Sequence, residues 1–317
     1  MRTGDREYKE RQYVVTSQAE ADLMNLESDM RTGDYPLEEL LGRLEAISQE
    51  TDKRGLRRPC ITELEARIYK SLGKYDLATA KYEQLIRSDQ GSYSTGAMDL
   101  YCNLRSKLLK EQADSCKGDP KFLVAEFDQV DNYLAALLVV SPTTERYNIR
   151  GSAWKRRTCL YKADAVGMEE AIRKAAEYYR ISHQQKPDAY PWSNWIALEN
   201  LLVAAGRQEW GAVDTHLPTI QQIQDAIGSL RLLYVAGPRS KIFQEWISPS
   251  NLLLANWLVM ATQAGAGAKD AYEDQVVASY EDVWEKVGSV EDKLSDIQHL
   301  QLLIDALGGL RGPRGIL

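Results

Sequence analysis

The 317-residue chain is predicted to be all-α, a right-handed solenoid of helical hairpins with irregular helices capping its two ends. Apolar residues recur at the three- and four-residue spacing of helices along most of the chain, and no alternating apolar run indicates a strand. The 10 prolines stand mostly at the edges of these periodic segments. Hairpins of this kind bury their apolar faces by stacking on their neighbours, which favours a continuous array.

Interruptions of the helical pattern divide the chain into four parts. We expect N-terminal capping helices in residues 1–58 and helical repeats in residues 59–217. A C-terminal helical region should follow in residues 218–308, and residues 309–317 should form a flexible tail. Within the C-terminal region a helix is expected to end at Pro249, because proline lacks the backbone N–H that a helix interior needs.

The clearest hairpin pattern lies around Gly73, which joins two short amphipathic segments. The small and large side chains of this pattern are Ala66, Tyr69, Tyr75, Ala78, Tyr82 and Leu85. Small residues let the paired helices approach closely, and the aromatic rings fill the gaps between hairpins. We therefore expect a turn at Gly73 and close packing at Ala78.

This order of residues resembles the tetratricopeptide repeat (TPR) family, whose repeats are helical hairpins of about 34 residues. A second, split match is formed by Tyr147, Gly151, Trp154, Ala175, Tyr179, Ser182 and Pro187. Its two halves are further apart than such a repeat allows, so the helices or their connection should be elongated. A weaker third match begins with Ala197, Asn200 and Gly206.

A more specific resemblance concerns residues 145–156, together with the aromatic segments 176–179 and 190–195. They are similar to helical-repeat regions that accompany caspase-like (CHAT) proteases in bacterial conflict and defence systems. The resemblance implies that this region senses, tethers or restrains a protease partner.

Composition and spacing argue against several classes of function. A net charge of −7 and a pI near 5.3 disfavour broad nucleic-acid binding. No apolar run approaches the roughly 20 residues that cross a bilayer, and no signal-peptide core follows the N-terminus, so a cytoplasmic protein is expected. We expect no cofactor and no metal, because the three histidines do not have ligand spacing. The cysteines, which should be reduced and structural, are Cys60, Cys102, Cys116 and Cys159.

A basic cluster is the most distinctive charge feature. It comprises Arg150, Lys155, Arg156 and Arg157, and at helical spacing Arg150 and Arg157 share one side with Trp154 between them. The cluster could hold a carboxylate, an acidic peptide or a phosphate. It could equally pair with acidic residues nearby, as charged helix faces usually do.

We expect a non-catalytic interaction scaffold or regulatory subunit that binds a partner protein or peptide along one face of the solenoid. By the resemblance, that partner could be a caspase-like protease. The residues expected to contact it are Arg150, Trp154, Arg157, Asn194, Trp195 and Asn200. Two other classes stay open: a nucleotide or nucleic-acid sensor that uses the basic cluster, and an enzyme whose site is not recognisable from sequence.

Overall fold

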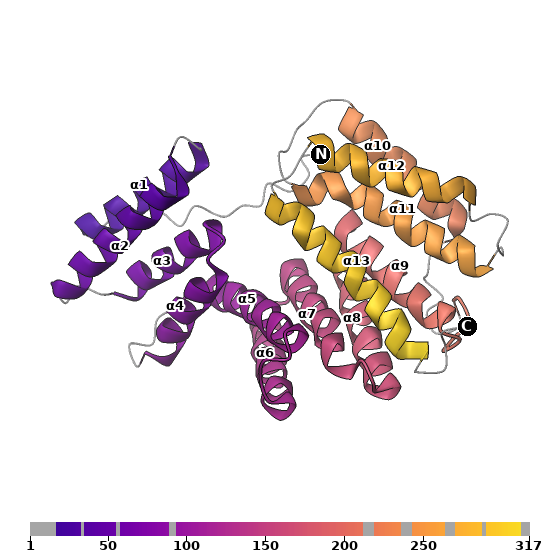
Figure 1. Cartoon of the computed structure of the whole chain (residues 1–317), viewed down its shortest axis with the longest axis horizontal. Coiled ribbons are helices and arrows are strands. Elements are labelled where there is room, and N and C mark those ends of the chain that lie inside the picture. Colours follow the sequence, from indigo (N-terminus) through magenta and orange to yellow (C-terminus); the bar gives the residue numbers. More distant parts are fainter. Residues whose placement is uncertain are drawn as a thin grey trace. The chain divides into compact units, whose positions relative to one another are not determined.

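A computed structural model of the chain describes residues 17–32, 35–54, 58–88, 93–211, 219–235, 243–263, 270–286 and 290–311. In those residues every regular element is helical, which confirms the predicted all-α fold (Figure 1). The elements are α1 (Gln18–Thr32), α2 (Leu37–Lys53), α3 (Pro59–Ser71), α4 (Tyr75–Arg87), α5 (Thr95–Asp114), α6 (Pro120–Val140), α7 (Thr144–Arg157), the 3-10 helix η1 (Thr158–Tyr161), α8 (Ala165–Gln185), α9 (Ala189–Ala204), α10 (Ile220–Val235), α11 (Phe243–Gln263), α12 (Asp270–Lys286) and α13 (Val290–Arg311). Among these described helices, none has both the length and the apolar character that a membrane crossing requires.

The chain forms two compact units, Met1–Leu108 and Leu109–Leu317, whose boundary falls within α5. In the first unit α1 packs on α2 and α3, and α3 pairs with α4. Leu23, Leu44, Ile61 and Tyr82 are fully enclosed in its core. The first unit is therefore built from consecutive helical hairpins.

The α3–α4 hairpin has the predicted register. Gly73 adopts a left-handed conformation with φ of 72°, which a glycine tolerates without strain. The Gly73 N–H donates to the Lys70 carbonyl at 3.1 Å, and the Lys74 N–H donates to the Tyr69 carbonyl at 2.9 Å. These two bonds are the Schellman closure that ends many helices. Ala78 is completely buried, as expected for a close-packing position.

In the second unit the helices pack mostly on their neighbours in the sequence. α7 packs on α6 and α8, α8 on α9, and α11 on α9, α10 and α12. α13 returns to α8, α9 and η1 (Figure 1). Five described helices of this unit begin at side chains that accept a backbone N–H of the first turn, which satisfies donors the helix cannot use itself. These N-cap residues are Asp119, Thr143, Asp164, Asp188 and Thr219.

Two expectations about the C-terminal region are wrong. α11 continues through Pro249, although an interior proline costs a helix about 3 kcal/mol. The buried side chains of Ile247, Leu252 and Val259 hold both sides of the proline in the core, and their burial offsets that cost. The expected tail also starts too early, since α13 extends to Arg311; residues 312–317 lie outside the described residues.

Candidate functional site

The α7–α8 hairpin carries the split repeat pattern. A Cβ at Gly151 would lie 3.1 Å from the Tyr179 ring, so the two helices approach closely and a larger residue there would require the ring to shift. The Ser152 hydroxyl lies 2.7 Å from the Tyr179 hydroxyl and 3.2 Å from that of Tyr190. The excess length of this hairpin resides in η1 and in the 21 residues of α8, which confirms the predicted elongation.

Three of the predicted site residues form one edge of α7, which faces α6. Arg150 donates from Nε and Nη2 to the two carboxylate oxygens of Asp131 at 2.7 and 2.8 Å. The Trp154 indole N–H donates to Asp131 Oδ1 at 2.8 Å. Arg157 Nη1 lies 2.5 Å from Asp128 Oδ1. Both arginines are therefore paired with acidic residues of the neighbouring helix, the second of the two interpretations that the sequence left open.

Cations also stack on the aromatic rings of this edge. The Arg157 guanidinium lies 4.7 Å and the Lys174 ammonium 4.2 Å from the centre of the Trp154 indole. The Arg150 guanidinium lies 4.4 Å from the ring centre of Tyr178. Burial lowers the pKa of Arg150, but the Asp131 carboxylate outweighs it and the net shift is upward. The edge thus ties α6, α7 and α8 together through charge and ring contacts.

The six predicted contact residues do not line one exposed face. Trp154 is 7% and Arg157 8% exposed, while Arg150 is half-buried. Asn194, Trp195 and Asn200 belong to α9, which packs against both α8 and α11, and none of their side chains exceeds 3% exposure. A helix with neighbours on two sides buries even its polar residues. Partner contact by these six residues stays a prediction, and it would require some of them to be uncovered.

A buried polar cluster, which the sequence did not single out, lies where α7, α9 and α13 meet. The Lys155 ammonium donates to Asn194 Oδ1 at 2.6 Å and lies 3.1 Å from His299 Nδ1. Burial, and then the charge of Arg156, lower the pKa of Lys155 from 10.5 to about 7. Burial raises the pKa of the nearby Asp296 to about 6. Burial and the Lys155 ammonium lower the pKa of His299 well below its ordinary value.

Helical spacing could have separated Lys155 from the rest of the basic cluster. Asn148, Ser152 and Lys155 are four and three residues apart, so they share a side of α7 that differs from the arginine side. We call the surface formed by Asn148, Ser152 and Lys155 of α7 and Asn194 of α9 the A-helix face, because in the predicted repeat register α7 and α9 are the first helices of successive repeats. Lys155 and Asn194 meet on this face.

Asn148 Oδ1 of α7 and Trp195 Nε1 of α9 are buried without a hydrogen-bond partner in the described part of the chain. A buried polar atom without a partner costs about 1–3 kcal/mol, and native proteins keep few of them. The acceptor on Asn148 belongs to the A-helix face and could receive a donor from another molecule.

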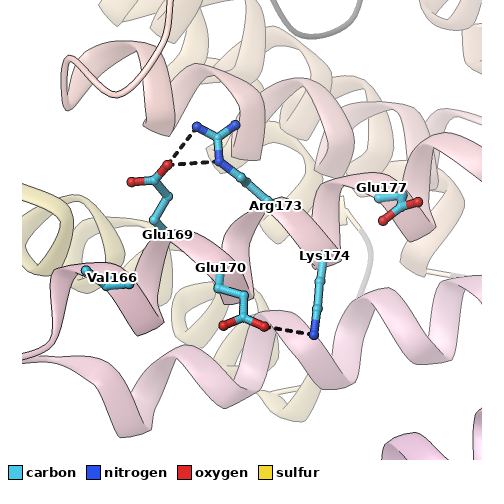
Figure 2. Close-up of a pocket in the computed structure, with 6 residues that line it drawn as sticks. All are labelled: Val166, Glu169, Glu170, Arg173, Lys174 and Glu177. Carbon is cyan, nitrogen blue, oxygen red and sulfur yellow. Dashed lines mark hydrogen bonds and ion pairs between the residues drawn. The ribbon is translucent and has the colours of Figure 1, made fainter.

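A shallow depression of about 380 Å³ lies on the outer surface of α8 (Figure 2). Glu169 accepts from Arg173 at 2.7 Å, and Glu170 accepts from Lys174 at 2.9 Å, each one helical turn apart. Figure 2 shows these two pairs side by side along the helix. Because the charges nearly balance within the depression, it does not select a ligand of either sign.

Three of the four thiols are poor nucleophiles in this environment, while Cys116 is exposed. Burial and the Glu20 carboxylate raise the pKa of Cys60 to about 11, and its Sγ donates to Glu20 Oε1 at 2.9 Å. Burial raises the pKa of Cys159 to about 12 and also raises that of Cys102. Since the thiolate is the reactive form, these three cysteines have the properties of structural residues.

Comparison with known proteins gives one similarity. No curated protein and no solved structure matches the chain. Residues 74–199 match the family model described as Tetratricopeptide Repeats-Sensor, TPR-S. This region runs from α4 to most of α9 and includes the α7–α8 hairpin.

Proposed function

We propose that this chain is a non-catalytic interaction module that binds a partner protein along the A-helix face and regulates it. TPR arrays bind partners along a continuous surface made by successive hairpins. The observation that carries the proposal is the buried acceptor of Asn148 on this face, which has no partner in the described residues; the Trp195 indole N–H of α9 is a second atom of this kind. Groups of this kind are costly unless a bound molecule satisfies them.

The charge pairing favours a protein over a nucleic acid as the partner. Arg150 and Arg157 are held by Asp131 and Asp128, and Lys155 is buried under α13. A phosphate backbone requires cations that face solvent on one surface. These three residues would have to break existing contacts before they could serve that purpose.

A caspase-like protease is the first partner to test. The support is the resemblance of residues 145–156 to helical regions that accompany such proteases, together with the match to a sensor-type repeat. On this proposal the repeat region recognises a signal or a partner, and the protease carries out the effector reaction.

The test is recovery of the partner by the full chain. Tagged wild-type protein is purified from its native cells, and the co-purifying proteins are measured by quantitative mass spectrometry. Asn148→Ala should lower recovery of a specific partner roughly ten-fold, as expected for loss of a buried hydrogen bond of about 1–2 kcal/mol. Asn132→Ala, at an exposed position of α6, is the matched control.

Thermal stability separates a binding role of Asn148 from a structural one. On the proposal, Asn148→Ala removes an acceptor that has no partner and should leave the thermal stability of the chain unchanged or slightly raised, whereas a structural role predicts a lower stability. If Asn148→Ala and Asn132→Ala recover the same proteins in the same amounts, the A-helix face is not the binding surface. If the wild type enriches no protein, the interaction function itself is wrong.

A further inference from the structure

The last helix lies on the repeat helices through a regular apolar seam. α13 packs on α8, α9 and η1 (Figure 1). Leu303, Ala306 and Leu310 are at most 5% exposed and follow the three- and four-residue spacing of one helix side. They belong to the same core cluster as α8 and α9 residues. α13 therefore binds the repeat region as an amphipathic helix binds a groove.

Three described polar contacts join α13 to the repeat region, and they share one polarity. Lys155 approaches His299 Nδ1 at 3.1 Å, and the Lys162 ammonium lies 3.6 Å from the Asp305 carboxylate. Arg207 Nη2 donates to the Leu310 carbonyl at 2.8 Å, near the C-terminal end of α13 where carbonyls lack helical partners. In each case the repeat region supplies a cation and α13 supplies an acceptor. The surface beneath α13 is thus suited to a helix with acidic groups.

One of these contacts is poorly matched. Lys155 is 8% exposed, yet the polar neighbours of its ammonium in the described residues are the Asn194 amide and the His299 imidazole, with no carboxylate in ion-pair distance. Arg156 on α7 repels it, and the Tyr179 ring lies 5.7 Å away. Asp296 of α13 is nearby, but its Oδ2 accepts from the Trp284 indole at 3.1 Å. A buried cation is more stable beside a carboxylate than beside neutral acceptors.

The outer side of α13 also carries apolar residues. Ile297 and Ile304, seven residues apart on one side, are 47% and 65% exposed. They lie beside the exposed Gln298 and Gln301, so the outer surface of α13 is partly apolar and partly polar. Two exposed isoleucines on one side of a helix that also packs its other side in the core are more than a helix facing only solvent needs.

We propose that α13 is an exchangeable, intramolecular occupant of a helix-binding surface on α7, α8 and α9. The partner that replaces it is an amphipathic helix with apolar residues spaced as in Leu303, Ala306 and Leu310 and a carboxylate where α13 has His299. This inference rests on the proposed function for the existence of a partner. It adds which surface is used, what kind of segment binds there, and that the chain blocks this surface until it is displaced.

The first experiment uses the unmodified full chain. Native-state hydrogen–deuterium exchange, resolved by peptide, measures how often each helix opens. If α13 is exchangeable, its amides should exchange at least roughly ten-fold faster than those of α8 and α9, because it opens without global unfolding. Exchange of α13 at the same rate as α8 and α9, and only with global unfolding, would overturn the proposal.

The second experiment supplies the helix from outside. A Cβ at the buried Gly309 would lie 2.6 Å from Met168 Cε, the end of a flexible side chain, and 3.6 Å from the Lys162 carbonyl oxygen, whereas a Cβ at the exposed Gly308 meets nothing within 4 Å. Gly309→Leu places a whole leucine side chain in this packed contact and should therefore undock α13. Gly308→Leu, with a similar change in helix propensity, should not. A fluorescent peptide of residues 290–311 should bind the Gly309→Leu chain and bind the wild type and Gly308→Leu at least roughly ten-fold more weakly, since the tethered α13 competes with it.

A change in the peptide tests the expected carboxylate. The peptide with His299→Glu should bind Gly309→Leu roughly ten-fold more tightly than the peptide with His299→Ala, because only the former pairs with Lys155. Equal affinities, or no binding of any peptide to a folded Gly309→Leu chain, would refute the surface. If Gly309→Leu does not fold, the exchange experiment on the wild type decides alone.

Both experiments read α13 itself and require no cellular partner. Fast exchange and peptide binding without recovery of any partner protein would refute the proposed function but leave the exchangeable helix. Recovery of a partner protein, with α13 amides exchanging only on global unfolding, would support the proposed function but refute the exchangeable helix.

Discussion

Replacing Lys155 with methionine should abolish a pH dependence of stability in the second unit. The folded chain lowers the pKa of Lys155 from 10.5 to about 7 through burial and then the charge of Arg156. Between those values the unfolded chain binds the proton and the folded chain largely does not, so the unfolding free energy rises with pH. From about pH 7 to about pH 8.5 the rise due to Lys155 should be about 1.5 kcal/mol.

The substitution should also change stability at neutral pH. A pKa lowered from 10.5 to about 7 corresponds to a cost of about 4–5 kcal/mol for keeping the buried ammonium charged. Methionine removes this cost but leaves the Asn194 Oδ1 atom without its donor, which costs about 1–3 kcal/mol. Lys155→Met should therefore raise the unfolding free energy at pH 7 by about 2 kcal/mol. The unfolding free energy of this variant should not rise between about pH 7 and about pH 8.5 as that of the wild type does.

Tryptophan fluorescence during urea unfolding is the appropriate assay. All seven tryptophans lie after residue 108, so the signal reports on the second unit. The pH range ends below 9.0, the ordinary pKa of a thiol, and any partial ionisation of the cysteines is common to the wild type and the variant. Lys121→Met, at an exposed site on α6, should retain the wild-type slope. A wild type without the slope, or a Lys155→Met variant that keeps it, would refute the reasoning about the buried ammonium.

Three further predictions concern packing, charge and chemistry. Ala78→Leu should overpack the α3–α4 hairpin and lower its unfolding free energy by about 1–3 kcal/mol, whereas Ala80→Leu, at an exposed site, should have little effect; equal thermal melting would contradict the hairpin register. Asp131→Ala removes the carboxylate that bridges α6 and α7 and should cost about 2–4 kcal/mol in urea unfolding, against near neutrality for Asn132→Ala. Single serine replacements of the four cysteines should leave partner recovery unchanged; a peptidase activity lost in one of them would overturn the non-catalytic assignment.

The hairpin around Gly73 is predictable because its signals are local. A left-handed turn position, a fully buried alanine and flanking tyrosines all act within about twenty residues of one another, the range over which helix patterns are informative. The same holds for Gly151 and Tyr179, where close approach favours a residue without a side chain. Pro249 is the counter-example, because tertiary burial around it outweighs a local preference.

The environment of the basic cluster is not predictable in the same way. Lys155 is buried by α13, and its neighbour His299 lies 144 positions later in the chain. Nothing in the local run of charges indicates which cation is covered and which meets an aspartate of α6. The periodicity does separate Lys155 from Arg150 and Arg157 on the helix, but only the packing of α13 determines the consequence for its charge.

The return of α13 to the repeat helices limits how this protein can evolve. Repeat arrays ordinarily gain and lose units easily, because each unit contacts only its neighbours and stability is close to a sum along a line. Here residues 290–311 contact η1, α8 and α9, so the chain from α9 to α13 forms a closed loop of fixed length. Duplication of a hairpin inside that loop would move the apolar residues of α13 away from the α8 and α9 residues on which they pack. We therefore expect related chains to vary in repeat number before α7 and to conserve it afterwards, a pattern that a survey of their lengths can test.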